Sequence, residues 1–499
     1  MAKEMKSLAK DTAIYGGTNI LAKFLNWMLV VLYTYTLPNP AEYGTVTNLY
    51  AWTSLLIVLL TYGMETGFFR FANKNTENAR KVYGNTLISV GFTSVIFALF
   101  IVLFQQPIAN VLKYENHPEY IWMLGLSVAM DAFASIPFVY LRFIKRPYAF
   151  ARLKLLYIAL SIVLNVFFLV VCPWLYKIAP ATISWFFNPN YGVGYIFVAN
   201  ILSTTIQTVV LSKYIFQAEF KFDGQLLKQI LKYSYPLLFL GIAGIANQNL
   251  DKMLFPFLQI GEQGKTDLGI YGAVSKLALV IMMFTQAFRF AYEPFVFAKQ
   301  KDSNSHQTYS DAMKFFVIFS FLIFLGMILY MDVIKYLVPS NYWVGLKVVP
   351  VILFSFIFQG IFFNLSIWYK LTDKNHYGAW FSAIGTLIIF AGNMLLVPKF
   401  SYWGSVWTAF AGYFIVMLLS YFFGQKFMPI DYKLKKLGAY LALTLILFFI
   451  STFIETPYLI VNLALKTVLM AIFIGYMIKK DFPLEQIPLV NKWVKKSKQ

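Results

Sequence analysis

The chain has 499 residues, of which 59% are hydrophobic and 13% are charged, and its formal net charge is +20. Soluble domains contain about 45–50% apolar and about 25% charged residues, so the composition excludes a soluble globular protein and indicates a multi-pass membrane protein. A single cysteine, Cys172, excludes an internal disulfide framework, and three widely separated histidines indicate no metal site.

The N-terminal segment is basic and leads directly into a full-length apolar run, so we expect an uncleaved first span rather than a signal peptide. Apolar runs of about 20–28 residues predict an all-α polytopic membrane protein with roughly fourteen transmembrane helices. The expected spans are 12–37, 42–70, 83–104, 119–141, 153–175, 193–215, 232–258, 268–298, 311–337, 342–369, 378–397, 403–424, 437–454 and 458–478, each end to within about 2–4 residues.

The basic residues gather in alternate loops. About 31 of the 42 lysines and arginines fall in the loops of one side, and the positive-inside rule places that side, with both termini, in the cytoplasm. The positive charge is therefore read as a topology signal with attraction to anionic membrane lipids, and not as a nucleic-acid surface.

The order of spans predicts an N-terminal lobe (1–215), a cytoplasmic amphipathic linker (216–231), a C-terminal lobe (232–425), two further helices (437–479) and a basic tail (480–499). In the linker, lysines at roughly helical spacing predict a surface helix. The longest outer loop, 173–191, carries Trp185, Phe186 and Phe187. This group is either an interfacial segment or an ordinary aromatic belt, and we favour the belt.

A short repeat relates the two lobes. AEYGTVTNLY (41–50) aligns with GIYGAVSKLA (269–278), and the same step of 22 residues from each tyrosine leads to Glu65 and to Glu293. The matched segments lie in the second and eighth spans, which have the same orientation. We therefore predict two parallel six-helix repeats related by an axis along the membrane normal.

Polar side chains deep in the first and fourth spans are the first site candidates, since charges within a membrane are costly. Asn19, Lys23 and Asn26 share one helix face. Lys23 faces either a cavity or a structural ion-pair partner. Asp131, with Lys23 as its expected partner, is either a proton- or sodium-coupling group or one half of a salt bridge.

The seventh and eighth spans carry the second group. Gln248, Asp251 and Lys252 form a polar patch, although Lys252 is near enough to the outer end to snorkel. In the eighth span Arg289 and Glu293 are i,i+4 neighbours, which face a cavity or form a simple intrahelical pair.

Glu65 lies about 7 Å from the inner boundary marked by Arg70. Glu65 and Glu293 are candidates for a cytoplasmic gate, and a local pair of Glu65 with Arg70 is the alternative. Lys466, in the last span, has no evident partner in the sequence.

No phosphate-binding loop, nucleophile elbow or zinc-binding HExxH motif occurs in the sequence. No cofactor is therefore expected, and any energy source is an ion gradient (Na+ or H+), the membrane potential or the substrate itself. No outer loop exceeds about 20 residues, which argues against a membrane glycosyltransferase or another enzyme.

The motifs NQNLDKMLFPF, LGIYGAVSKLA and FRFAYEPFVFAK, together with GMETGFFRFA in the first half, resemble the polysaccharide transporter (Wzx-like) branch of the MOP superfamily. That superfamily also includes MATE exporters and MurJ-type lipid II flippases. The resemblance covers almost the whole chain. It implies two six-helix lobes in a V shape around a central cavity and transport by alternating access.

The function that the resemblance implies is transfer of an undecaprenyl-pyrophosphate-linked oligosaccharide (an O-antigen, capsule or exopolysaccharide unit) to the outer leaflet of a bacterial inner membrane. Glycan polymerase machinery is an expected partner. The cationic candidates for the cavity are Lys23, Lys252 and Arg289. A lipid II flippase is the first alternative, and a MATE-like cation antiporter is the second.

Overall fold

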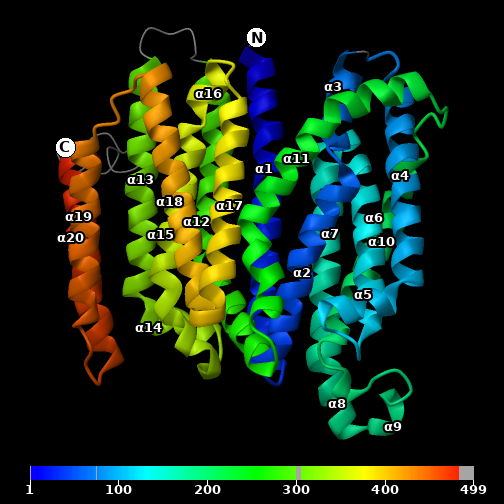
Figure 1. Ribbon diagram of the computed structural model, residues 1–499, viewed down its shortest axis with the longest axis horizontal. Coiled ribbons are helices and arrows are strands. Elements are labelled where there is room, and N and C mark those ends of the chain that lie inside the picture. The colour runs from blue at the N-terminus through cyan, green and yellow to red at the C-terminus, as the bar shows by residue number, and fades with distance from the viewer. Residues whose placement is uncertain (1, 75, 299–304, 483–499) are drawn as a thin grey trace, which may run out of the picture. The chain divides into compact units, whose positions relative to one another are not determined.

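The computed structural model describes residues 2–74, 76–298 and 305–482, and within these ranges the side chains of residues 2–13, 293–295, 297–298 and 305 are not described. Every regular element in the described part is a helix (Figure 1). Thirteen of these helical segments are long and apolar enough to cross a membrane. The 35-residue helix α1 (Ala2–Thr36) is not among them, and with it the count equals the roughly fourteen helices expected.

The chain divides into two compact units: unit 1 comprises 1–276 and 379–412, and unit 2 comprises 277–378 and 413–499. This division does not follow the predicted lobes along the chain, because residues 268–276 at the start of the eighth span and residues 379–397 of the eleventh belong to unit 1. The long helices up to residue 298 are α1, α2 (Pro40–Thr61), α4 (Ala79–Leu103), α6 (Pro118–Phe143), α7 (Pro147–Val166), α10 (Gly194–Ile215), α11 (Gly224–Leu258) and α12 (Glu262–Ala298).

The remaining long helices are α13 (Ser305–Leu329), α15 (Val349–Leu365), α17 (His376–Phe400), α18 (Tyr402–Phe427), α19 (Leu434–Thr452) and α20 (Leu459–Lys480). The predicted span 311–337 was too long at its outer end: α13 stops at Leu329 and the short helix α14 (Met331–Ile334) follows. The predicted span 342–369 is likewise divided into a 3-10 segment (Ser340–Val348), α15 and α16 (Ile367–Leu371).

The second span is also divided. Tyr62 and Gly63 have positive φ angles of 31° and 75°, so α2 ends at Thr61 and a separate helix, α3 (Met64–Lys74), carries the chain to the inner loop. A Cβ on Gly63 would lie 2.8 Å from the Ser234 carbonyl oxygen. Glycine is required here both by the left-handed backbone and by the close approach of α11.

The linker between the predicted lobes is not a surface helix. Residues 216–223, which include Lys221, contain no helix, and the other two lysines from which the surface helix was predicted, Lys228 and Lys232, lie in the first turns of α11. Asp223 caps that helix by accepting a hydrogen bond from the Leu226 N–H at 3.0 Å. The capping geometry starts the helix at Gly224 and leaves the preceding residues irregular.

The outer loop of 173–191 is partly folded. Helix α7 continues as a π-helical turn (Phe167–Val171) and then as α8 (Cys172–Ile178). The short helix α9 (Pro180–Ile183) follows. Within unit 1, α8 and α9 lie at the end opposite α3 (Figure 1). Phe187 is buried and stacks on Tyr195, whereas Trp185 is 82% exposed. The expected aromatic belt is therefore divided between a small core and an exposed surface.

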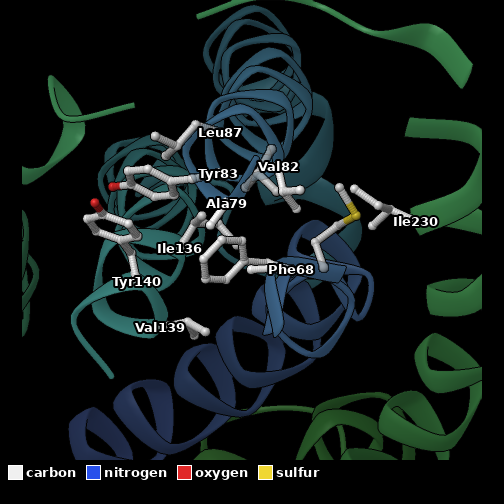
Figure 2. Close-up of a cluster of buried hydrophobic side chains, with 12 residues drawn as sticks. Phe68, Ala79, Val82, Tyr83, Leu87, Ile136, Val139, Tyr140 and Ile230 are labelled. Atoms are coloured by element: carbon white, nitrogen blue, oxygen red, sulfur yellow. The ribbon is translucent and has the colours of Figure 1, made fainter. Parts of the chain in front are cut away.

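An aromatic core holds together the end of unit 1 at which α3 lies. Phe68 of α3, Tyr83 of α4 and Tyr140 of α6 are buried together, and the Tyr83 and Tyr140 rings stack 4.0 Å apart (Figure 2). Ile230 of α11 closes the cluster. This packing fixes α3, and therefore Glu65 at its start, against α6 and α11.

Candidate functional site

The repeated Tyr-Gly motif lies where α2 and the first half of α12 cross. A Cβ on Gly44 would lie 2.1 Å from the Lys265 carbonyl oxygen, and one on Gly269 would lie 1.8 Å from the Pro40 carbonyl oxygen. A Cβ on Gly272 would lie 2.3 Å from the Thr47 hydroxyl oxygen. Small residues allow helix backbones to approach this closely in a membrane. The matched motif residues Tyr43, Val46 and Leu49, and Tyr271, Val274 and Leu277, are all buried.

A charged cluster borders this crossing. The Lys252 ammonium lies 3.1 Å from Asp251 Oδ2 and 4.9 Å from the centre of the Tyr271 ring. The Tyr271 hydroxyl donates a hydrogen bond to the same carboxylate oxygen, at 2.5 Å. The Lys252 side chain is only 16% exposed. Lys252 is therefore held in an ion pair, and its charge is offset by Asp251.

The other polar residues of this part of α11 contact backbone groups and α17. Lys252 Nζ donates to the Gln248 backbone carbonyl at 3.4 Å, while the Gln248 side chain is exposed. Asn247 donates to the Ser382 carbonyl and hydroxyl oxygens, each at 3.1 Å. The polar patch of α11 is thus attached to α12 and α17 within unit 1.

Asn48 completes the cluster, and sequence reasoning did not single it out. Pro256 has no N–H, so the carbonyl of Lys252, four residues earlier in α11, has no intrahelical donor. Asn48 Nδ2 donates to that carbonyl at 2.7 Å, and the Tyr114 hydroxyl donates to Asn48 Oδ1 at 3.1 Å. The proline inside an apolar helix was the signal that a donor from outside the helix is needed.

Glu65 lies in a different part of unit 1, at the start of α3. Its polar and charged neighbours are the Ser135 hydroxyl, Arg142 and Lys154. Arg70 instead stacks on Tyr233, with its Cζ 4.2 Å from the ring centre. The positive groups near Glu65 are therefore Arg142 of α6 and Lys154 of α7, whereas the local-pair alternative named only Arg70.

Asp131 lies on α6 near the middle of the membrane span. Its electrostatic neighbours include the Lys154 ammonium and the hydroxyls of Tyr50 and Tyr157. Lys154 of α7 is thus an electrostatic neighbour of Asp131, of Glu65 and of Lys23. It is the cation that the sequence analysis undervalued.

The cationic candidates differ in surroundings. Lys23 and Asn26 are exposed on α1, and Asn19 is half-buried. Arg289 belongs to unit 2, where its Cζ lies 4.7 Å from the centre of the Phe363 ring. The side chain of Glu293 lies outside the described residues, so its pairing with Arg289 and its relation to Glu65 stay predictions.

Lys466 has a partner that the sequence analysis did not identify. Its ammonium lies 2.6 Å from Asp332 Oδ2, and its side chain is 9% exposed. The predicted span 311–337 had placed Asp332 inside a membrane-spanning helix. In the structure it lies in the short helix α14, beyond the end of α13, and contacts α20. This ion pair therefore belongs to the packing of α20 within unit 2.

Comparison with known proteins identifies the family of the chain and structures that share its fold. A family model described as "Polysaccharide biosynthesis protein" matches residues 8–291, more than half of the chain. No curated protein matches the chain.

Solved structures share the fold. The lipid II flippase MurJ in an inward closed conformation is 13% identical, with a TM-score of 0.72, over 93% of this chain and 98% of that one. An inward-facing MATE multidrug transporter of the MOP superfamily is 14% identical, with a TM-score of 0.65, over 84% and 96%. A MATE protein in the straight conformation is 13% identical, with a TM-score of 0.60, over 87% and 97%. The chain therefore belongs to the polysaccharide biosynthesis protein family and has the fold of the MOP-superfamily transporters.

Proposed function

We propose that this protein is a flippase that carries an undecaprenyl-pyrophosphate-linked oligosaccharide from the inner to the outer leaflet of a bacterial cytoplasmic membrane. The observation that carries the proposal is the match to the polysaccharide biosynthesis family over residues 8–291. The helical membrane fold supports a transporter rather than an enzyme. Both termini are proposed to be cytoplasmic, in accord with the distribution of basic residues.

The physical task of such a protein is to move a diphosphate across about 30 Å of hydrocarbon. We propose that Lys23 of unit 1 and Arg289 of unit 2 each supply fixed positive charge to the pyrophosphate during alternating access. Lys252 contributes less, because Asp251 already offsets its charge. The amides of Asn19, Asn26 and Gln248 are suited to hydrogen bonds with sugar hydroxyls.

Coupling and gating are assigned to the carboxylates. Asp131 is proposed to couple transport to H+ or Na+, because it lies in the apolar interior beside one lysine and two tyrosine hydroxyls. Glu65 and Glu293 are proposed to act at the cytoplasmic gate, with Arg70 nearby in sequence. The helix break at Tyr62–Gly63 supports a local role for Glu65, because it separates α3 from the rest of the span.

The decisive experiment is complementation of strains that lack a flippase for a lipid-linked glycan but keep its assembly and polymerisation enzymes. We expect surface glycan to be restored by the wild-type chain and to be absent with an empty vector. A panel of strains with different glycans identifies the substrate. Failure in the whole panel, with the protein present in the membrane, would contradict the proposal.

A lipid II flippase is the second candidate, favoured by the TM-score of 0.72 to MurJ over 93% of this chain. Rescue of growth in a strain depleted of its lipid II flippase, without restored surface glycan elsewhere, would select it. A MATE-like antiporter is the third candidate. It predicts resistance to cationic drugs in an efflux-deficient strain and no glycan phenotype.

A further inference from the structure

The segment of 216–223, which joins α10 to α11, presents unpartnered aromatic side chains. Phe216 is 78% exposed, Phe220 51% and Phe222 65%. The segment leaves α10 at Ile215 and enters α11 at Gly224, both ends of candidate membrane spans. Its aromatic residues therefore lie within a few residues of two span ends, at the depth of the lipid headgroups.

The backbone of this segment is fastened to the start of α4. The Glu219 N–H donates to the Arg80 carbonyl at 3.2 Å, and a Cβ on Gly84 would lie 1.9 Å from the Glu219 carbonyl oxygen. Asn85 donates to the Asp223 carbonyl at 2.7 Å. These contacts hold the segment as a fixed strap against α4.

A tight turn inside the strap displays one of the aromatic rings. Lys221 N–H donates to the Glu219 carbonyl at 2.8 Å, which is the hydrogen bond of a γ-turn with Phe220 at its apex. The Glu219 and Lys221 side chains pair across the turn at 3.1 Å. The strap is anchored by its backbone and by Ala218, which packs on the inner core of unit 1. Phe216, Phe220 and Phe222 are not part of that core.

The charge around the strap is positive. Between residues 213 and 232 there are four lysines, Lys213, Lys221, Lys228 and Lys232, and two acids, Glu219 and Asp223. Both acids are already in ion pairs, Glu219 with Lys221 and Asp223 with Lys81 at 2.8 Å. The Leu226 N–H and Lys81 hold the pKa of Asp223 below its usual value, so it stays paired at neutral pH. Exposed Lys213, Lys228 and Lys232 remain to attract anions.

We infer that the strap of 216–223 is a membrane anchor, which inserts Phe216, Phe220 and Phe222 into the inner leaflet beside anionic lipid headgroups. Aromatic rings favour the interface because it is apolar on one side and wet on the other. Basic residues near an anionic membrane surface add electrostatic attraction to it. The anchor holds the start of α11 at the inner leaflet, whatever substrate is carried.

The test uses a fluorescent label on the strap itself. In a Cys172→Ala background, the label is placed by Lys221→Cys, and the protein is reconstituted in nanodiscs whose lipids carry a quencher near the headgroup. We expect strong quenching by the lipid and little by iodide in the water. Phe220→Ser/Phe222→Ser should lose the lipid quenching, while the matched control Phe220→Leu/Phe222→Leu should keep it.

A second arm tests the charge. Lipid quenching should increase when phosphatidylglycerol replaces part of the phosphatidylcholine, and Lys228→Gln/Lys232→Gln should remove that increase. Monodisperse size-exclusion profiles confirm that each variant is folded. Quenching by iodide but not by lipid, or lipid quenching that is unchanged in the serine variant, would overturn the anchor. The first of these results would instead identify the strap as a surface for a soluble partner.

Discussion

The ion pair of Lys466 and Asp332 shows why single charges in spans are difficult to interpret one at a time. The two residues are separated by 134 positions and meet at 2.6 Å. The neighbouring hydroxyls of Tyr330 and Thr467 are 3.1 Å apart. α20 is thus attached to the end of α13 by polar contacts within a largely apolar surface.

We expect Asp332→Asn to lower the stability of the folded protein by about 3 kcal/mol, because it leaves the buried Lys466 ammonium without its carboxylate. The measurement is the thermal unfolding midpoint of the purified protein in detergent. The double variant Asp332→Leu/Lys466→Met removes both charges and should recover most of the loss. Equal midpoints for the wild type and Asp332→Asn would show that the pair contributes nothing.

Asp481 gives a pH-dependent prediction at the same scale. Burial raises the pKa of this carboxyl, but hydrogen bonds from Lys314 at 2.9 Å and from Tyr440 at 2.8 Å outweigh it and hold the pKa below its usual value. A lowered folded-state pKa stabilises the protein above the unfolded pKa of about 3.9. That contribution is lost as the pH falls below about 4.

The thermal unfolding midpoint of the wild type should therefore decrease more steeply from about pH 5 to about pH 3 than that of Asp481→Asn. This range extends about one unit to each side of the unfolded pKa. At neutral pH the variant should be the less stable protein. Parallel pH profiles of the two proteins would exclude a role for this carboxylate. Lys314 and Lys436 both have a structural role here, because their ammonium groups lie 2.9 Å and 3.8 Å from Asp481 Oδ1.

At the scale of elements, the crossing of α2 and α12 brings two helix backbones into close contact at glycines. We expect Gly44→Ala to destabilise the protein by about 1–3 kcal/mol, because the new Cβ would meet a backbone carbonyl that no side-chain rotation can move. Gly244→Ala in α11 is the matched control, since nothing lies within 4 Å of its Cβ position. It should be neutral or stabilising by up to about 1 kcal/mol.

Thermal midpoints of both variants, measured in the same detergent, check this pair. A Gly44→Ala protein as stable as Gly244→Ala would show that the two helices separate without cost. The sequence indicated the importance of the Tyr-Gly step through its repetition. Its contact partner could not be predicted, because close packing of glycine depends on which helix approaches it.

The positions of the spans were largely predictable from hydropathy, since a lipid environment permits only long apolar helices here. The break at Tyr62–Gly63 and the irregular strap of 216–223 were not predicted. Both depend on contacts with distant residues, Ser234 for the first and Arg80 and Asn85 for the second. Hydropathy does not report such contacts, because neither the helix break nor the strap changes the local content of apolar residues.

At the scale of the whole molecule, the proposed transport rests on fixed cations. We expect Lys23→Ala and Arg289→Ala each to reduce glycan export about tenfold or more, the effect of losing a charged hydrogen bond of about 1.5–3 kcal/mol. The readout is surface glycan in the complemented strain, normalised to protein in the membrane. Lys276→Ala, in the same helix as Arg289 but about 140° around it at 100° per residue, is the control and should retain export.

Normal glycan in both Lys23→Ala and Arg289→Ala would contradict a cationic cavity. The flippase proposal itself is tested separately, by the complementation experiment. Reduced export in the Lys276→Ala control as well would show that positive charge acts diffusely rather than at two positions.

The sequence by itself determined the membrane setting, the all-helical fold, the approximate spans and the polar residues that deserve mutation. These follow from local composition, because hydropathy and charge act over one span at a time. Only the tertiary structure decided that Lys252 is offset by Asp251, that Asn48 serves the carbonyl freed by Pro256, and that Lys466 meets Asp332. Asn48 and Lys466 lie on other helices than their partners, and Asp251 is a neighbour of Lys252 in α11 that Tyr271 of α12 holds by a hydrogen bond. These contacts are therefore set by packing between helices and not by spacing along the chain.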